Sequence, residues 1–134
     1  MKKFSILLII IGFFTSCSND NNNNSETVVL IGKWKLIEQL ADPGDGSGTF
    51  HSIDSQKILE FKTNGTILSE NGSLCNPYSE QQITSGNYSL SESRITTNCQ
   101  DPNIAFISFE IIDSFLILNF ASNEGFSQKF IKIQ

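Results

Sequence analysis

Few residues in this chain are able to do covalent or acid–base chemistry. The 134 residues include one histidine, His51, and three cysteines, whereas serine and aspartate are plentiful. A catalytic triad needs an activated nucleophile, but no Gly-x-Ser-x-Gly elbow occurs and no other pattern singles out a nucleophile. One histidine also leaves a zinc site short of ligands. We therefore expect His51 to be a solvated loop residue, and we predict no enzyme activity, no cofactor and no metal site.

The loop of residues 41–50 combines four acid or hydroxyl side chains with three glycines. Its acid and hydroxyl oxygens belong to Asp42, Asp45, Ser47 and Thr49. Such hard oxygens suit calcium, but the loop lacks the remaining alternate acids and the terminal glutamate of an EF-hand. The favoured interpretation is a flexible rim loop over the open end of a β-barrel, with Asp42, Asp45 and Phe50 as candidate ligand-binding residues.

The first seventeen residues have the pattern of a bacterial lipoprotein signal. A basic start precedes the apolar run Phe4–Phe14, which as a helix would be about 16 Å long and too short to span a bilayer. Phe14-Thr15-Ser16-Cys17 resembles a lipobox, where a peptidase cuts before an acylated cysteine. We expect residues 1–16 to be a signal peptide and Cys17 to be the lipidation site. The alternative is an ordinary secretory signal with an incidental cysteine.

The segment after Cys17 is polar and of low complexity. Residues 17–27 are rich in asparagine and cannot bury apolar surface, so they are predicted to be a flexible, lipidated tether to the domain of residues 28–134. Acylation of Cys17 would supply the membrane contact. The predicted location is the cell envelope, as an outer membrane lipoprotein that faces the periplasm or the cell surface.

Two cysteines remain once Cys17 is assigned to the lipid. An even pair in an exported domain predicts one disulfide, between Cys75 and Cys99. It would tie the loop after the third predicted strand to the end of the fifth, and the alternatives are two free thiols or a soft-metal site.

The charge balance argues against nucleic acid as a partner. The isoelectric point is near 4.7, with 9 basic residues against 14 acidic ones. The basic residues never cluster, whereas phosphate binding needs a footprint of Lys and Arg.

From Val28 onward the sequence predicts strands and turns. Short β-rich runs alternate with Gly, Asn, Ser and Asp turns, and no run of about twelve residues has a helical period. The eight predicted strands are Val28–Leu40, Lys57–Lys62, Thr66–Glu70, Ile83–Leu90, Arg94–Asn98, Ile104–Ile112, Phe115–Phe120 and Phe126–Ile133.

Side chains alternate along these strands, so that each has a dry face and a wet face. In the first strand Trp34, Leu36 and Leu40 share the dry face. Glu38 lies on the same side, where it would point inward as a polar anchor for a ligand, or outward if a bulge intervenes. One buried face on eight consecutive strands predicts an all-β, eight-stranded antiparallel up-and-down barrel, because closure removes the sheet edges. A β-sandwich is the alternative.

Gly32-Lys33-Trp34 on the first strand, followed by seven hairpin-linked strands, resembles the lipocalin signature. Further similarity to small lipocalin-like domain lipoproteins of Bacteroidota lies in Asp42–Phe50, Phe61–Thr66, Gly86-x-Tyr88 and Lys129–Ile133. The resemblance implies a lipocalin-like barrel in which Gly32 and Trp34 form the plug of the closed end. Lipocalins also stack an arginine over this tryptophan, and here Lys129 or Lys132 is available instead.

The resemblance implies a binding module. Eight strands enclose space for side chains or for one small ligand. We therefore predict a monomeric, lipid-anchored barrel for a small hydrophobic molecule, with Glu38, Phe61 and Tyr88 as further candidates for ligand contact. The alternative is a protein-interaction or inhibitor-type envelope barrel without a small-molecule ligand.

Overall fold

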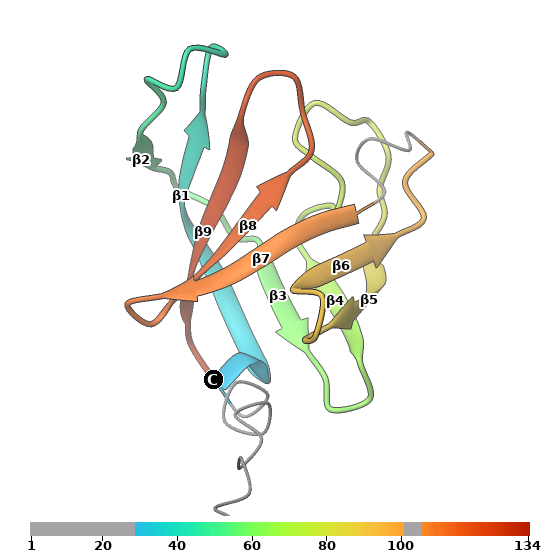
Figure 1. Cartoon of the computed structure of the whole chain (residues 1–134). Coiled ribbons are helices and arrows are strands. Elements are labelled where there is room, and N and C mark those ends of the chain that lie inside the picture. Colours follow the sequence, from blue (N-terminus) through green and yellow to red (C-terminus); the bar gives the residue numbers. More distant parts are fainter. Residues whose placement is uncertain (1–28, 101–105) are drawn as a thin grey trace, which may run out of the picture.

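The structure, a computed structural model, describes residues 29–100 and 106–134 as a sheet of nine antiparallel strands (Figure 1). The predicted signal peptide, Cys17 and the predicted tether therefore lie outside the described residues. The strands are β1 (Gly32–Ala41), β2 (Phe50–Ser52), β3 (Ile58–Phe61), β4 (Thr66–Glu70), β5 (Ser85–Ser89), β6 (Arg94–Thr97), β7 (Phe106–Ile112), β8 (Phe115–Phe120) and β9 (Phe126–Lys132). No helix in this part of the chain is long and apolar enough to cross a bilayer.

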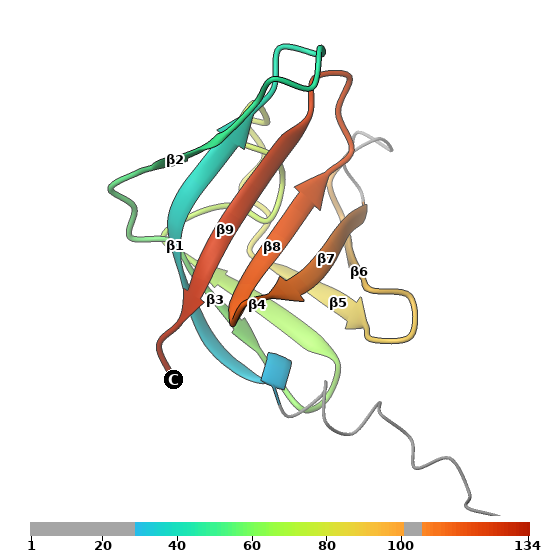
Figure 2. The same cartoon turned by 60° about the vertical axis from the view of Figure 1, so that its left-hand side comes forward.

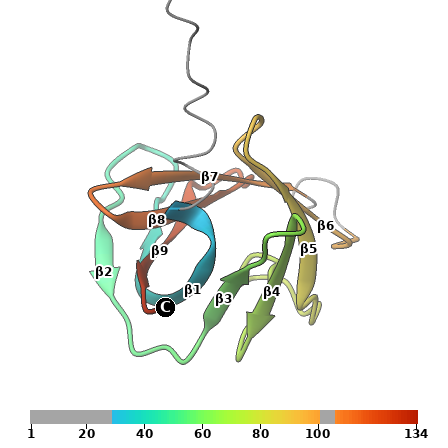
Figure 3. The ribbon, with the colours of Figure 1, turned by 90° about the horizontal axis from the view of Figure 1, so that it is seen from below.

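The sheet closes on itself through β1. One edge of β1 pairs with β9 along almost its whole length, from Trp34 opposite Lys132 to Ala41 opposite Phe126. The other edge pairs with β3 near its start and with the short β2 near its end. Eight strands thus form a closed antiparallel barrel, and Figure 3 shows β1 between β9 and β3. The barrel prediction is confirmed and the sandwich is excluded.

Each of the eight predicted strands is present; Thr66–Glu70 and Phe115–Phe120 have the predicted bounds, and the other six differ at one or both ends. Val29 and Leu30 form a helical turn, so β1 begins at Gly32 and not at Val28. The sequence analysis missed β2, a three-residue strand with two exposed residues that has no alternating pattern to reveal it. It forms because the end of β1 would otherwise have an unpaired edge, which the backbone of Phe50–Ser52 satisfies.

The inside of the barrel is filled by side chains. The fully buried residues that point inward are Trp34, Leu59, Phe61, Ile67, Ile95, Ile107, Leu116, Leu118 and Phe130. They come from alternate positions of neighbouring strands, such as Leu116 and Leu118 on β8. The middle of the barrel is therefore a packed core and not an empty calyx.

A bulge in β1 changes which side chains face inward. The register against β9 shifts between Leu36 and Glu38, and beyond it Gln39 pairs with Gln128, a buried residue of β9. Leu40 instead pairs with Ser127 on the outer side. The prediction that Leu40 shares the inner face with Trp34 is wrong, because one extra residue moves every later side chain to the other face.

The disulfide between Cys75 and Cys99 is formed, as predicted. It joins the long loop after β4 to the segment after β6, with 24 residues of sequence separation. A closed loop of this size stabilises the fold by about 3 kcal/mol in the chain-entropy model. The loop after β4 has little secondary structure, so the bond fixes it against the barrel.

Trp34 lies near the start of β1, opposite Lys132 near the end of β9, and Figure 1 shows the start of β1 beside the C-terminus. Only 1% of the surface of Trp34 is exposed, and its Nε1 donates a hydrogen bond of 2.8 Å to the Leu30 carbonyl. Lys132 Nζ lies 5.5 Å from the centre of the indole ring, so Lys132 takes the stacked position. Gly32 has a φ of +124°, and a Cβ there would overlap the Gln134 carbonyl, so glycine is required.

Replacing Trp34 tests how much this end contributes to stability. Trp34→Ala should lower the free energy of unfolding by about 3–5 kcal/mol, because it leaves a large cavity under the helical turn. Trp34→Phe, which keeps a ring but loses the N–H donor, should have a smaller effect. Urea denaturation followed by far-UV circular dichroism measures both. A loss below about 1 kcal/mol for Trp34→Ala would contradict the packing described above.

Candidate functional site

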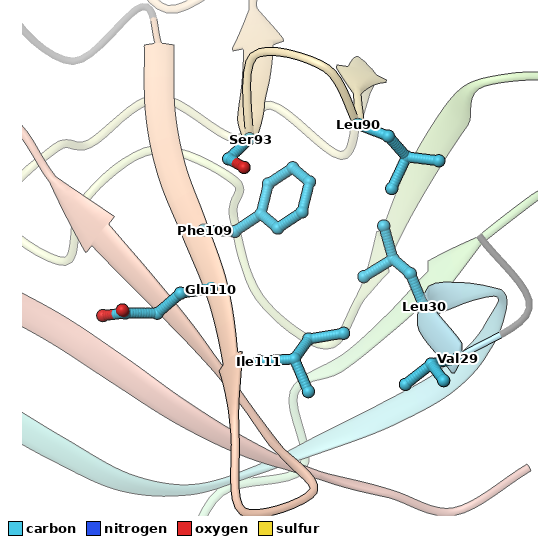
Figure 4. Close-up of a pocket in the computed structure, with 7 residues that line it drawn as sticks. All are labelled: Val29, Leu30, Leu90, Ser93, Phe109, Glu110 and Ile111. Carbon is cyan, nitrogen blue, oxygen red and sulfur yellow. The ribbon is translucent and has the colours of Figure 1, made fainter. Parts of the chain in front are cut away.

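Two of the cavities in the described part of the chain lie at opposite ends of the barrel. The first, here called the apolar cavity, has a volume of about 380 Å³. Its walls are the helical turn before β1, the turn between β5 and β6, and β7 (Figure 4). The lining residues are Val29, Leu30, Leu90, Ser93, Phe109, Glu110 and Ile111.

The apolar cavity is backed by an aromatic cluster. Phe109, which lines it, makes an edge contact with Phe61 at 6.2 Å between ring centres, and Phe61 makes another with Tyr88 at 5.2 Å. The Tyr88 hydroxyl donates a hydrogen bond to the Lys62 carbonyl, which holds the ring in place. Two of the predicted ligand residues, Phe61 and Tyr88, thus lie behind the cavity and reach it through Phe109.

The charged residue of the apolar cavity is turned away from its centre. Figure 4 shows the Glu110 carboxylate pointing away from Phe109, Leu90 and Ile111. It accepts a hydrogen bond from the Asn119 amide on the outer face of the barrel. The side chains offered to a ligand are therefore mostly hydrocarbon, with the Ser93 hydroxyl beside Phe109.

The second cavity, here called the polar cavity, has a volume of about 350 Å³ and lies at the end where β1 finishes. Its walls are the loop between β2 and β3, the loop after β4, and the facing residues Gln39 and Gln128. Amide and hydroxyl groups predominate among the lining residues, which include Ser55, Asn71, Ser73, Asn76, Ser79 and Gln82.

A buried lysine lines the polar cavity. Only 5% of Lys57 is exposed, and its Nζ donates a hydrogen bond of 2.8 Å to the Gln128 Oε1 atom. The rings of Phe120 and Phe130 lie about 6 Å from the ammonium, at 6.0 and 5.9 Å. Burial disfavours the charged form and lowers the pKa of Lys57 from 10.5 to about 8. The ammonium form therefore still predominates at neutral pH.

The sequence analysis missed Lys57, although a signal was present. Lys57 has the parity of Leu59 and Phe61, the two inward residues of β3. A lysine at the first position of a strand is usually a surface residue, so its place in the alternation did not by itself predict that it is buried. Gln128 was missed for the same reason, because a glutamine in a strand is usually also a surface residue.

The acids of the rim loop organise the loop itself. The Asp42 carboxylate accepts hydrogen bonds from the backbone N–H groups of Gly44, Gly46 and Gly48. These bonds, led by that from Gly48, lower the pKa of Asp42. Asp45 accepts one from the N–H of Ser47. Oxygens engaged in this way are poor candidates for calcium, and the residues described contain no group of three potential metal ligands.

The other two predicted ligand residues lie on the outer surface. The bulge turns Glu38 outward, where its carboxylate pairs with Lys129 Nζ at 2.8 Å. The same ammonium lies 5.3 Å from the Phe50 ring and 4.8 Å from the Phe115 ring. Glu38 and Phe50 thus hold β2 and β9 together on the outside, and neither residue lines the two cavities.

Comparison with known proteins agrees with this barrel. The family model described as a lipocalin-like domain matches residues 30–116, which is more than half of the chain. The chain belongs to the lipocalin-like domain family. No curated protein matches it, and no solved structure does. Membership of this family suggests a module that binds hydrophobic ligands, and the members of the family are generally not enzymes.

The buried lysine should make stability depend on pH. Between about pH 8 and 10.5 the unfolded chain holds a proton on Lys57 that the folded protein has lost, so the free energy of unfolding should rise with pH. From pH 7 to 10 the rise should be about 2–3 kcal/mol relative to Lys57→Met, which does not titrate. Denaturant titrations of the two proteins at several pH values measure the difference. Parallel curves over this range would contradict the burial of a charged lysine.

Proposed function

We propose that this protein is a lipid-anchored lipocalin-like module that holds a small hydrophobic molecule in the cell envelope. The observation that carries the proposal is the apolar cavity, whose volume of about 380 Å³ lies within the usual range of ligand sites. Burial of a ligand against Leu30, Leu90 and Phe109 would be driven by the hydrophobic effect. Membership of a family of binding barrels supports the same function.

The position of the cavity suits delivery from a membrane. Val29 and Leu30 form part of its wall and are the first described residues, so the chain that leads back to Cys17 leaves the barrel beside it. Twelve residues separate Cys17 from Val29, a reach of about 40 Å if fully extended. An acylated Cys17 would thus keep the apolar cavity close to the membrane from which a hydrophobic ligand would come.

The single tryptophan provides a probe of this site. Trp34 is hydrogen-bonded to Leu30, whose side chain lines the apolar cavity, so a bound ligand should change its fluorescence. Titration with a fatty acid, a sterol and haem should give a saturable change for at least one of them. Ile111→Asn should weaken that binding about tenfold, because it places an amide in the apolar wall.

Ile112→Asn is the matched control, since Ile112 is the next residue of β7 and is 47% exposed on the outer face. It should leave binding unchanged. Native mass spectrometry of protein from its own cells should also detect a co-purifying small molecule. An empty barrel in that experiment, together with no response to any of the three probes, would reject ligand binding and favour a protein-interaction role.

The lipid anchor is tested separately. Metabolic labelling with an alkyne-tagged palmitate should mark the wild-type protein, and Cys17→Ser should abolish the label, because the thiol is the site of acylation. The double variant Cys75→Ser/Cys99→Ser is the control and should keep the label, since it removes two other thiols. Labelling that persists in Cys17→Ser would contradict the assignment of the anchor.

A further inference from the structure

We propose that the polar cavity is a second binding site, for a small organic monocarboxylate whose carboxylate group pairs with Lys57 Nζ. This site lies at the opposite end of the barrel from the apolar cavity and does not depend on the function proposed there. The surroundings of the buried Lys57 ammonium, and the shape and chemistry of the space beside it, support a site of this kind.

Among the described residues, none pairs Lys57 with a charge of opposite sign. Among the described residues its hydrogen-bond acceptor is the neutral Gln128 amide, and the three ion pairs of the fold involve other basic residues. An ammonium has three N–H donors, and a buried charge without a partner of opposite sign is costly. A bound anion would supply both the missing charge and the missing acceptors.

The loop after β4 holds the lysine in place. Gly72 lies directly against its stem, and a Cβ at Gly72 would come within 2.8 Å of the Cγ and Cδ atoms of Lys57. The Ser69 hydroxyl donates a hydrogen bond to the Gly72 carbonyl and fixes this part of the loop. The cavity wall at Cys75 is fixed in turn by its disulfide to Cys99. The ammonium therefore has a defined position beside the cavity.

The lining of the cavity indicates which anion fits. Its walls offer neutral amides and hydroxyls, which suit a ligand with hydroxyl or carbonyl groups, and its one carboxylate, Asp54, is exposed at the rim and not paired with Lys57. One buried ammonium balances one negative charge, whereas a dianion such as phosphate would leave an excess charge close to Asp54. The polar walls disfavour a lipid tail, and a volume of about 350 Å³ has room for a small metabolite.

Calorimetric titration of the full-length protein at pH 7 tests the proposal. The probes are lactate, benzoate and glucuronate, with glucuronamide as the uncharged analogue and inorganic sulfate as the dianion. At least one carboxylate should bind saturably, and Lys57→Met should weaken it at least tenfold. Lys62→Met is the matched control, because it removes the same charge five residues further along the same segment, outside the polar cavity, and it should leave binding unchanged.

A second variant keeps the test informative if Lys57→Met is poorly folded. The Gln128 amide oxygen now accepts a hydrogen bond from Lys57 Nζ, and Gln128→Glu would replace it with a carboxylate of the protein itself. This carboxylate would pair with the ammonium and should abolish the binding of an added carboxylate. The proposal is wrong if no carboxylate binds below about 10 mM, if binding survives in both variants, or if glucuronamide or sulfate binds as well as the carboxylate. Trp34 fluorescence reports the other end of the barrel, so failure here leaves the proposed function standing, and the reverse also holds.

Discussion

The pairing of β1 with β9 is the interaction on which the rest of the structure depends. It turns a meander of consecutive hairpins into a closed barrel, in which the last strand lies beside the first (Figure 2). Closure gives the sheet an inside that is buried for every strand and leaves two ends where the ladder stops. Both cavities lie at these ends, because the middle is occupied by large side chains from all sides.

The two ends differ in chemistry because different parts of the chain build them. At the end where the chain begins, a helical turn and a tight hairpin bring Leu30, Leu90 and Phe109 together. At the other end, long loops without regular structure contribute mainly amides and hydroxyls. A single strand, β1, contributes to both ends, and its bulge decides that Gln39 faces the polar cavity while Glu38 faces solvent.

Much of the fold followed from local patterns in the sequence. The eight barrel strands were predictable because alternation and turn residues act over a few positions, and the cysteine pair was predictable by counting. The bulge after Leu36 was not, since it depends on how β1 meets a strand about ninety residues away. Lys57 was missed for a related reason, because its burial comes from Gln128 and Gly72, which are distant in sequence. The candidate ligand residues were therefore predicted less well than the strands that hold them.

The start of β1 and the last residues of the chain are hydrogen-bonded to each other, which has a mechanical consequence. Lys33 is hydrogen-bonded through its N–H and its carbonyl to the last two residues, Gln134 and Ile133. A force applied through the chain before residue 29 would act first on the helical turn and then on these few hydrogen bonds. The hydrogen bonds would break one after another. The turn also forms a wall of the apolar cavity, so tension would deform that cavity before it reached the barrel core.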